Sequence, residues 1–311
     1  MINVKITIAY ITAREEPHLE WLCDGIEQQA RSGDKIELIV VDALGRPATA
    51  IGYRPVKAIT KLVETRPKPT IWQGPHRITA HDFFANANAR NTAIVLCTTS
   101  YICFLDDRCK LDPGWLAQVR LGEKKRNAVL CGSYTKHWSG GISMDHRRAL
   151  DPNGKKRCLP SWCFGCNLAL PLRWALKVNG FEEGCDPVGL EDCVFGQMLS
   201  NAGYRLDFVV EMAVQQDRQD LRGYVHPVKF PRQDKGKSPL DKSHAIESRF
   251  FVRKRTEFSP DLMKLRKQIL RGEPFSVPDP SVDYRDWYDG SLIRGAGMTS
   301  DEREARARSS S

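Results

Sequence analysis

Apolar residues in the first third of the chain form short runs that alternate with segments of helical spacing. Ile6 to Ile11 alternates like a strand, while Ile36 to Val41 (IELIVV) and Tyr101 to Leu105 (YICFL) are continuous apolar runs, typical of strands buried in a parallel sheet. Pro17 to Ala30 and Phe83 to Val95 lie between these runs, and we predict both as helices. This alternation predicts an α/β fold with a mostly parallel central sheet flanked by helices.

Acidic residues stand where two of the predicted strands end. Asp42 closes the second run, and Asp106 and Asp107 close the third. Ligands of open α/β sheets bind beyond the carboxyl ends of the strands. The sequence therefore predicts a site at this edge of the sheet.

The pattern is less regular elsewhere. We predict a helix over Pro260 to Leu270 with Ser259 as its cap, and a second structured block from Trp162 to Val210. The segment 46–75 supports no confident assignment. Residues 140–160 are rich in Gly, Lys and Arg, and we expect a mobile loop there.

Positive charge is concentrated in one stretch. Between Arg218 and Arg271, fifteen lysines and arginines stand against six aspartates and glutamates, an excess of nine that equals the net charge of the whole chain. Such a field favours a polyanionic partner, nucleic acid or an anionic membrane surface. A solvated basic face beside a phosphate-bearing donor explains it equally well.

Ten cysteines do not predict a disulfide scaffold here, because several lie within apolar runs and no secretion signal precedes them. We expect reduced, buried thiols. Cys163 and Cys166 form a CxxC, but no second pair at zinc-site spacing accompanies it.

Three blocks together resemble the family-2 glycosyltransferases of the GT-A fold. They are the first strand with IELIVVD, then NARNTAIVLCTTSYICFLDDRCKLDPGWL, and then FGCNLALPLRWALKVNGFEEGCDPVGLEDCVFGQMLSNAGYRL. The ordered combination, over about residues 4 to 210, is more specific than any single motif. The resemblance implies a GT-A domain over 1–215 with a nucleotide-sugar half (1–115) and an acceptor half (116–215), a basic segment over 216–275 that completes the active site, and a C-terminal arm and flexible tail over 276–311.

The family holds a divalent cation, Mn²⁺ or Mg²⁺, against the donor diphosphate with a DxD motif. Here the motif reads Asp106-Asp107-Arg108. In a continuing strand, Asp106 and Arg108 would share one face and Asp107 the other. Either the chain turns and Asp107 is a metal ligand, which we favour, or Arg108 contacts phosphate itself. His226 would be the last metal ligand, and Lys235 and Lys237 would bracket the phosphates.

The resemblance also assigns residues to the donor and acceptor pockets. The predicted donor-binding residues are Thr12, Arg14, Glu15, Asp42, Arg90, Asp106 and Arg108. Trp162, Gly165 and Asn167 match the segment that lines the sugar and acceptor pocket. Three of them also have a structural interpretation: Asp42 could form a turn, Arg90 could be an arginine on a helix surface, and Trp162 could belong to the core.

Glu191 and Asp192 are the predicted catalytic pair. In the family, the Asp of this motif removes a proton from the acceptor hydroxyl, because an alcohol is a poor nucleophile at neutral pH. The pair stands at the start of a predicted helix, where the helix dipole favours a carboxylate. The alternative is that both acids only cap that helix.

The resemblance thus implies an inverting glycosyltransferase that uses a nucleotide diphosphate sugar, with UDP as the expected nucleotide, and a hydroxyl acceptor. One hypothesis for the acceptor is a hydroxymethylated pyrimidine in DNA, modified by a virus-encoded enzyme. A polysaccharide, a lipid-linked glycan or a protein is the alternative acceptor. A non-catalytic nucleic-acid-binding protein and a nucleotidyltransferase remain open. No segment resembles a signal peptide or a transmembrane helix, so we expect a cytoplasmic protein, in the host cytoplasm if it is viral.

Overall fold

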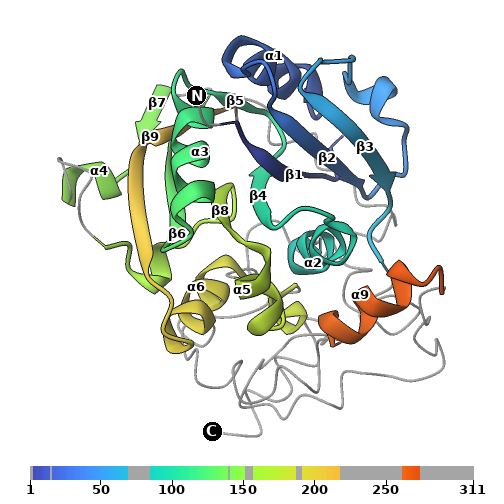
Figure 1. The fold of residues 1–311 in the computed structure, drawn as a ribbon. Helices are drawn as coiled ribbons and strands as arrows, with labels where there is room; N and C mark the ends of the chain where they lie inside the picture. Colours follow the sequence, from blue (N-terminus) through green and yellow to red (C-terminus); the bar gives the residue numbers. More distant parts are fainter. Residues whose placement is uncertain are drawn as a thin grey trace, which may run out of the picture.

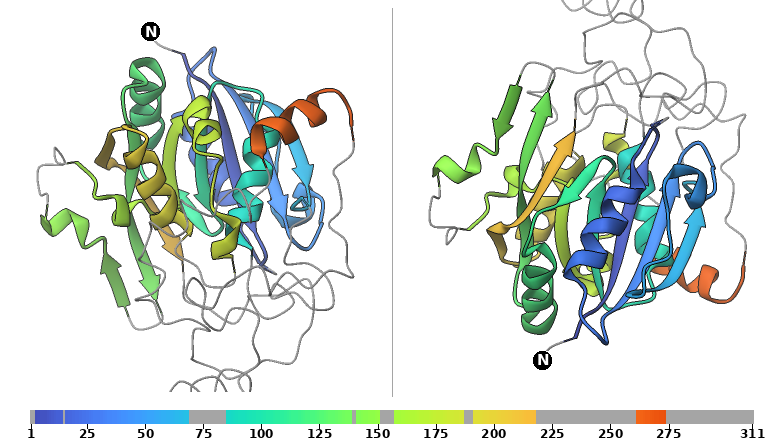
Figure 2. Two further views of the ribbon diagram at one scale, coloured as in Figure 1. Left: turned by 90° about the horizontal axis from the view of Figure 1, so that it is seen from below. Right: turned by 90° about the horizontal axis from the view of Figure 1, so that it is seen from above.

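The computed structural model describes residues 3–14, 16–68, 85–138, 141–150, 157–186, 191–217 and 261–273. The described residues form one nine-stranded sheet with helices on both faces (Figures 1 and 2). The predicted α/β class with a central sheet is therefore correct. Among the described helices, none has the length and apolar composition needed to cross a membrane.

The strand order is β3-β2-β1-β4-β8-β6-β9-β5, with β7 paired to β6 at the side. Pairing is parallel from β3 through β4 and between β6 and β9, whereas β8 is antiparallel to both of its neighbours. The strands are β1 (Lys5–Thr12), β2 (Lys35–Asp42), β3 (Ile59–Thr65), β4 (Tyr101–Asp106), β5 (Cys109–Leu111), β6 (Val129–Trp138), β7 (Gly141–Met144), β8 (Asn167–Pro171) and β9 (Leu206–Asp217).

Two layers of helices cover the sheet. Helices α1 and α3 lie on one face, and α2, α5 and α6 lie on the other, with α9 packed on the outside of α2 (Figure 2). The helices are α1 (Leu19–Gln29), α2 (Asn86–Leu96), α3 (Trp115–Lys125), α4 (Arg147–Leu150), α5 (Leu172–Lys177), α6 (Glu191–Asn201) and α9 (Leu262–Leu270), and the 3₁₀ turns are η1 (Ala48–Ile51), η3 (Pro160–Trp162) and η4 (Glu183–Cys185).

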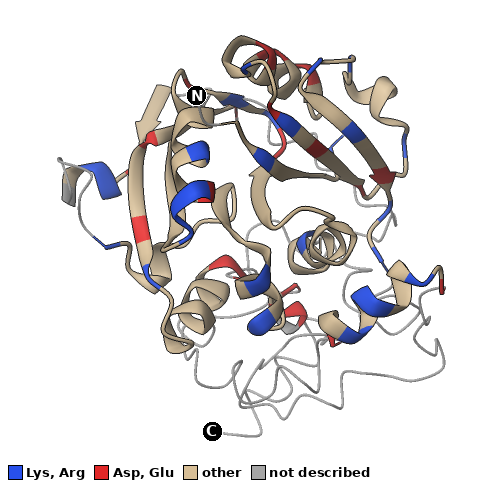
Figure 3. Ribbon diagram, in the orientation of Figure 1, with Lys and Arg blue, Asp and Glu red and all other residues tan. Residues whose placement is uncertain are grey.

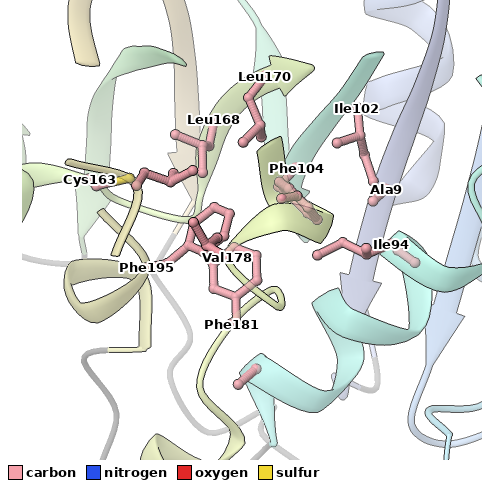
Figure 4. Packing of buried hydrophobic residues seen from close by; sticks show 14 of the residues in the cluster. Ala9, Ile94, Ile102, Phe104, Cys163, Leu168, Leu170, Val178, Phe181 and Phe195 are labelled. Carbon is pink, nitrogen blue, oxygen red and sulfur yellow. The ribbon is translucent and has the colours of Figure 1, made fainter. Parts of the chain in front are cut away.

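Alternate residues of the central strands contribute to two hydrophobic cores, one on each face of the sheet. In β1, Ile8 and Tyr10 pack toward α1 and α3, while Ala9 and Ile11 pack toward α2. Figure 4 shows the second core, in which Phe181 stacks on Phe195 at 4.0 Å and meets Phe104 edge-on at 5.2 Å. Burial on both faces explains why β2 and β4 appear in the sequence as continuous apolar runs.

The structure corrects several predicted elements. The segment 46–75 contains β3, an edge strand in which no residue is fully buried, so its sequence lacks a clear period. Part of the expected loop at 140–160 is ordered as β7 and α4. Helix α9 is capped by Asp261, whose Oδ1 accepts from the Lys264 N–H at 3.0 Å, and Ser259 lies outside the described residues.

All ten cysteines are free thiols, and nine of them are buried, as expected. Burial raises the pKa of most of them, Cys166 to about 12, so these thiols stay protonated at neutral pH. Among the described residues, no group of three or more His, Cys, Asp and Glu side chains is arranged to hold a metal.

Candidate functional site

The carboxyl ends of β1, β2 and β4 meet at one edge of the sheet. Thr12 is paired in register with Asp42, and Ile11 with Asp106. The strand-end residues therefore lie side by side, as the sequence predicted. Which of their side chains remain open to a ligand depends on the arginines around them.

Arg90 of α2 connects this edge to the first turn of α6. Its Nη2 donates to Asp106 Oδ1 at 2.8 Å, and its Nη1 donates to Glu191 Oε1. The guanidinium is buried, and it lies 5.3 Å from the centre of the Phe181 ring. Burial alone would lower the pKa of Arg90, but the nearby carboxylates of Asp106, Glu191 and Asp192 raise it above its ordinary value. Arg90 is therefore a fixed positive charge that sets the position of α6 relative to β4.

Gly165 makes this arrangement sterically possible. A Cβ atom at this position would lie 2.6 Å from Arg90 Cζ, so any larger residue would displace the guanidinium. The Gly165 N–H also donates to Asp192 Oδ2 at 3.0 Å. The same glycine thus contacts Arg90 and orients Asp192.

Glu191 and Asp192 have different surroundings, although they are adjacent in the sequence. Glu191 is buried against Arg90; burial and the Asp192 charge raise the pKa of Glu191 to about 6, against the opposing effect of Arg90. Asp192 is half-buried, and its Oδ1 accepts from the Cys193 N–H at 2.8 Å. Of the two predicted catalytic acids, Asp192 is the one that an acceptor can approach.

The chain turns immediately after β4, with Arg108 in the left-handed region at φ 55°. Asp107 consequently points into the protein, where Oδ2 accepts from Thr12 Oγ1 at 2.7 Å and Oδ1 accepts from Arg14 Nε at 3.0 Å. Its side chain is 11% exposed, against 24% for Asp106. The expected turn is present, but Asp107 is bound by Thr12 and Arg14, and Asp106 is the more accessible carboxylate.

Arg108 holds the loop that connects β1 to α1. Its Nε donates to the Glu16 carbonyl at 2.8 Å, its backbone N–H donates to the Pro17 carbonyl at 2.9 Å, and its side chain is 7% exposed. Thr12 and Arg14 are buried as well. Thr12, Arg14 and Arg108, three of the predicted donor-binding residues, are therefore held by contacts within the protein.

Asp42 is engaged in the same way. Its carboxylate accepts from the backbone N–H groups of Leu44 and Arg46, both at 3.0 Å, and from Arg46 Nε at 2.8 Å, and its side chain is 1% exposed. Arg46 also donates to the Arg14 carbonyl at 2.5 Å. These contacts correspond to the turn-forming interpretation of Asp42. The contact of Arg46 with Asp42 was not predicted from the sequence, although an arginine four residues after an acidic strand end was a signal for this ion pair.

The predicted sugar-pocket residues are divided between the core and the surface. Asn167 is fully buried: its Nδ2 donates to the carbonyls of Ser133 at 2.9 Å and Met212 at 2.6 Å, and its Oδ1 accepts from Trp115 Nε1 at 2.9 Å. A contact between Asn167 and a sugar would break these bonds, so the structure favours a role in joining β8 to β6 and β9. Trp162 is half-buried on η3.

Arg147 is a second residue that the sequence analysis missed, because it lies in the expected loop. Its guanidinium donates to Asp145 Oδ2 at 2.6 Å and to the carbonyls of Gly132 and Trp162, both at 2.7 Å. It lies within 4.6 Å of the centre of the Phe164 ring. Arg147 therefore anchors η3 and the segment leading to Gly165. Glu15, His226, Lys235 and Lys237 lie outside the described residues, and their predicted roles stay predictions.

No family model matches the sequence, and no curated protein matches it. Solved structures do match. Residues 1–349 of TarS from S. aureus align with a TM-score of 0.50 and 14% identity, covering 69% of this chain and 60% of that one. The mannosyltransferase PcManGT from Pyrobaculum calidifontis, solved with GDP-mannose and Mn²⁺, aligns with a TM-score of 0.48 and 22% identity, covering 71% of this chain and 59% of that one. GalNAc-T7, solved with UDP, GalNAc and Mn²⁺, aligns with a TM-score of 0.47 and 12% identity, covering 70% of this chain and 44% of that one.

The fold is the GT-A fold. At these identities the likeness concerns the fold alone, and the chain spans about 60% or less of the length of these three proteins. The expected GT-A architecture is thereby confirmed.

The buried ion pairs of Arg90 predict a large loss of stability when the guanidinium is removed. Arg90→Met leaves Asp106 and Glu191 without their partner and should lower the free energy of unfolding by about 3–5 kcal/mol in urea denaturation. Arg205→Met is the matched control, because Arg205 pairs with Asp207 at the surface with side chains 43% and 31% exposed; it should cost less than about 1 kcal/mol. Equal losses would show that Arg90 does not hold the site together.

The surroundings of Asp107 predict a pH dependence of stability. Burial raises its pKa from 3.8 to about 6, although Arg14 and Thr12 oppose the shift. Between about pH 4 and 6 the folded state keeps a proton that the unfolded state has released, so stability falls as pH rises through this window. From pH 4 to pH 7 the wild type should lose about 1–3 kcal/mol of unfolding free energy relative to Asp107→Asn, whose side chain does not titrate. A difference independent of pH would contradict this account.

Proposed function

We propose that this protein transfers a sugar from a nucleotide diphosphate donor to a hydroxyl acceptor. The observation that supports this most directly is the Arg90 bridge, which brings the accessible carboxylate of Asp192 to the edge where β1, β2 and β4 end. A donor bound beyond these strand ends would lie between Asp106 and Asp192.

Asp192 is the general base in this proposal. The N–H groups of Gly165 and Cys193 each donate to one of its oxygens, which fixes the carboxylate while leaving it partly exposed. It takes the proton from the acceptor hydroxyl as that oxygen bonds to the anomeric carbon, and the bond to the diphosphate breaks on the opposite face. One displacement of this kind inverts the anomeric configuration. Glu191 acts as a positioning residue, because its carboxylate is buried against Arg90.

The donor diphosphate requires positive charge as it departs. A cation that is bound largely by donor phosphates needs only one or two protein carboxylates, and the 24% exposed carboxylate of Asp106 fits this requirement better than Asp107 does. We therefore assign the proposed Mn²⁺ or Mg²⁺ contact to Asp106, where a bound cation would stabilise the leaving diphosphate. PcManGT and GalNAc-T7 were both solved with Mn²⁺, which is consistent with a divalent cation as the proposed cofactor.

UDP is the proposed nucleotide, with GDP as the alternative that PcManGT presents. A screen of nucleotide sugars, with the released nucleotide identified, tests this assignment. Release of a nucleoside diphosphate fits glycosyl transfer, whereas release of pyrophosphate would identify a nucleotidyltransferase.

For the acceptor, a hydroxymethylated pyrimidine in DNA remains our candidate, motivated by the basic stretch 218–271. Absence both of sugar transfer to hydroxymethylated duplex DNA and of salt-dependent DNA binding would reject it.

Asp192→Asn should lower kcat by about 10²–10⁴-fold, because the amide cannot accept the acceptor proton. The dissociation constant for the released nucleotide, measured by calorimetry, should stay unchanged. Asp207→Asn is the matched control, since Asp207 lies in β9 and its carboxylate accepts from the surface residue Arg205. Full activity of Asp192→Asn would show that Asp192 is not the base. A wild-type protein that binds nucleotide but does not turn over any donor would favour a non-catalytic binding protein.

Asp106→Asn should weaken the binding of nucleoside diphosphate in the presence of Mn²⁺, and a chelator should weaken binding to the wild type by a similar factor. The variant should then respond little to the chelator, because the carboxylate that holds the cation is already absent. Asp107→Asn serves as the comparison, and it should keep the chelator response. If Asp107→Asn lost that response while Asp106→Asn kept it, the ligand assignment would have to be reversed.

A further inference from the structure

The outer face of helix α9 combines basic and apolar side chains, although the helix is firmly attached to the protein. On its inner side, Leu262 and Leu265 are buried in the core next to α2. Arg266 Nη1 donates to the Val95 carbonyl at 3.0 Å and to the Cys97 carbonyl at the end of α2. The outer face is therefore displayed on a rigid support.

The exposed residues form one stripe along this helix and its last turn: Met263, Lys264, Lys267, Leu270 and Arg271. Their spacing of one, four, seven and eight positions places them on a single side. Met263 is 50% exposed and Leu270 is 63% exposed. Acidic residues stand only at the two ends, where Asp261 caps the helix and Glu273 lies 3.8 Å from Arg271.

Helix α5 also carries exposed basic residues and is connected to the start of α9. Its exposed residues Arg173 and Lys177 precede Asn179, whose Oδ1 accepts from the Leu262 N–H at 2.9 Å at the start of α9. Figure 3 shows basic residues on both helices. The stripe formed by Met263, Lys264, Lys267, Leu270 and Arg271 is here called the α9 face.

We propose that the α9 face binds an anionic lipid surface. Lysine and arginine near such a surface are attracted to its phosphate-bearing headgroups. Apolar side chains among them gain free energy by entering the boundary between headgroups and acyl chains, as on interfacial amphipathic helices. Met263 and Leu270 decide between lipid and nucleic acid, because a DNA backbone offers phosphates but no apolar layer for these side chains. This surface interaction is independent of the proposed sugar transfer.

The test is co-sedimentation of the full chain with phosphatidylglycerol-containing vesicles, and with phosphatidylcholine vesicles as the neutral arm. The double variant K264E/K267E should bind anionic vesicles at least about 30-fold more weakly, from about fivefold per lysine. K124E/K125E is matched in charge, since these two exposed lysines end α3 elsewhere on the protein, and it should lose much less affinity. All four lysines are exposed, so thermal unfolding should be little changed.

M263S/L270S, measured against vesicles and against duplex DNA, tests the choice of partner. It should weaken vesicle binding by about five- to tenfold and leave DNA binding unchanged. Equal effects of K264E/K267E and K124E/K125E on vesicle binding would overturn the proposal, because net charge alone would then explain the binding. Loss of DNA binding in K264E/K267E without loss of vesicle binding would overturn it as well, in favour of a nucleic-acid surface.

Discussion

The contact between the Arg90 guanidinium and two carboxylates from different parts of the fold is the constraint on which the candidate site depends. Asp106 ends a strand of the parallel half of the sheet, whereas Glu191 begins a helix that follows the antiparallel strand β8 in the chain. A buried arginine cannot be left without its partners, since an uncompensated charge in the interior is costly. These two contacts therefore fix the distance between β4 and α6. Gly165 packs against the same guanidinium, so the segment that orients Asp192 is held by the same group.

The same principle extends along the edge of the sheet. Arg14 pairs with Asp107, Arg46 with Asp42, and Arg90 with Asp106 and Glu191. Most of the negative charge gathered by the strand ends is thus neutralised within the protein before any ligand arrives. Asp106, although paired with Arg90, and Asp192 at the start of α6 are the acids of the site that remain partly accessible. A site of this kind can hold many acids for structural reasons while offering few for chemistry.

The sequence was sufficient to place the strand ends because buried parallel strands have continuous apolar runs whose limits are easily recognised, and Asp42 and Asp106 stand at those limits. It was not sufficient to orient Asp107. The rule of alternating side chains applies only while the strand continues, and here the next residue, Arg108, adopts φ 55°. The roles of Asn167 and Arg147 were also not predictable, because these side chains donate to carbonyl groups of distant segments, such as those of Met212 and Gly132, that no local pattern encodes. The sequence thus identified the chemical groups, and tertiary pairing determined which of them are available.

Exposure separates the functional candidates from the structural ones more sharply than residue type does. Glu191 and Asp192 are adjacent acids at one helix start. Arg90 is bound to the buried Glu191, whereas the more accessible Asp192 accepts from the backbone N–H groups of Gly165 and Cys193. A backbone donor orients a carboxylate without neutralising it, whereas a buried guanidinium does both. A carboxylate of the first kind keeps the charge that a proton acceptor needs. This difference in partners, rather than the motif alone, is the physical reason for assigning proton transfer to Asp192 and positioning to Glu191.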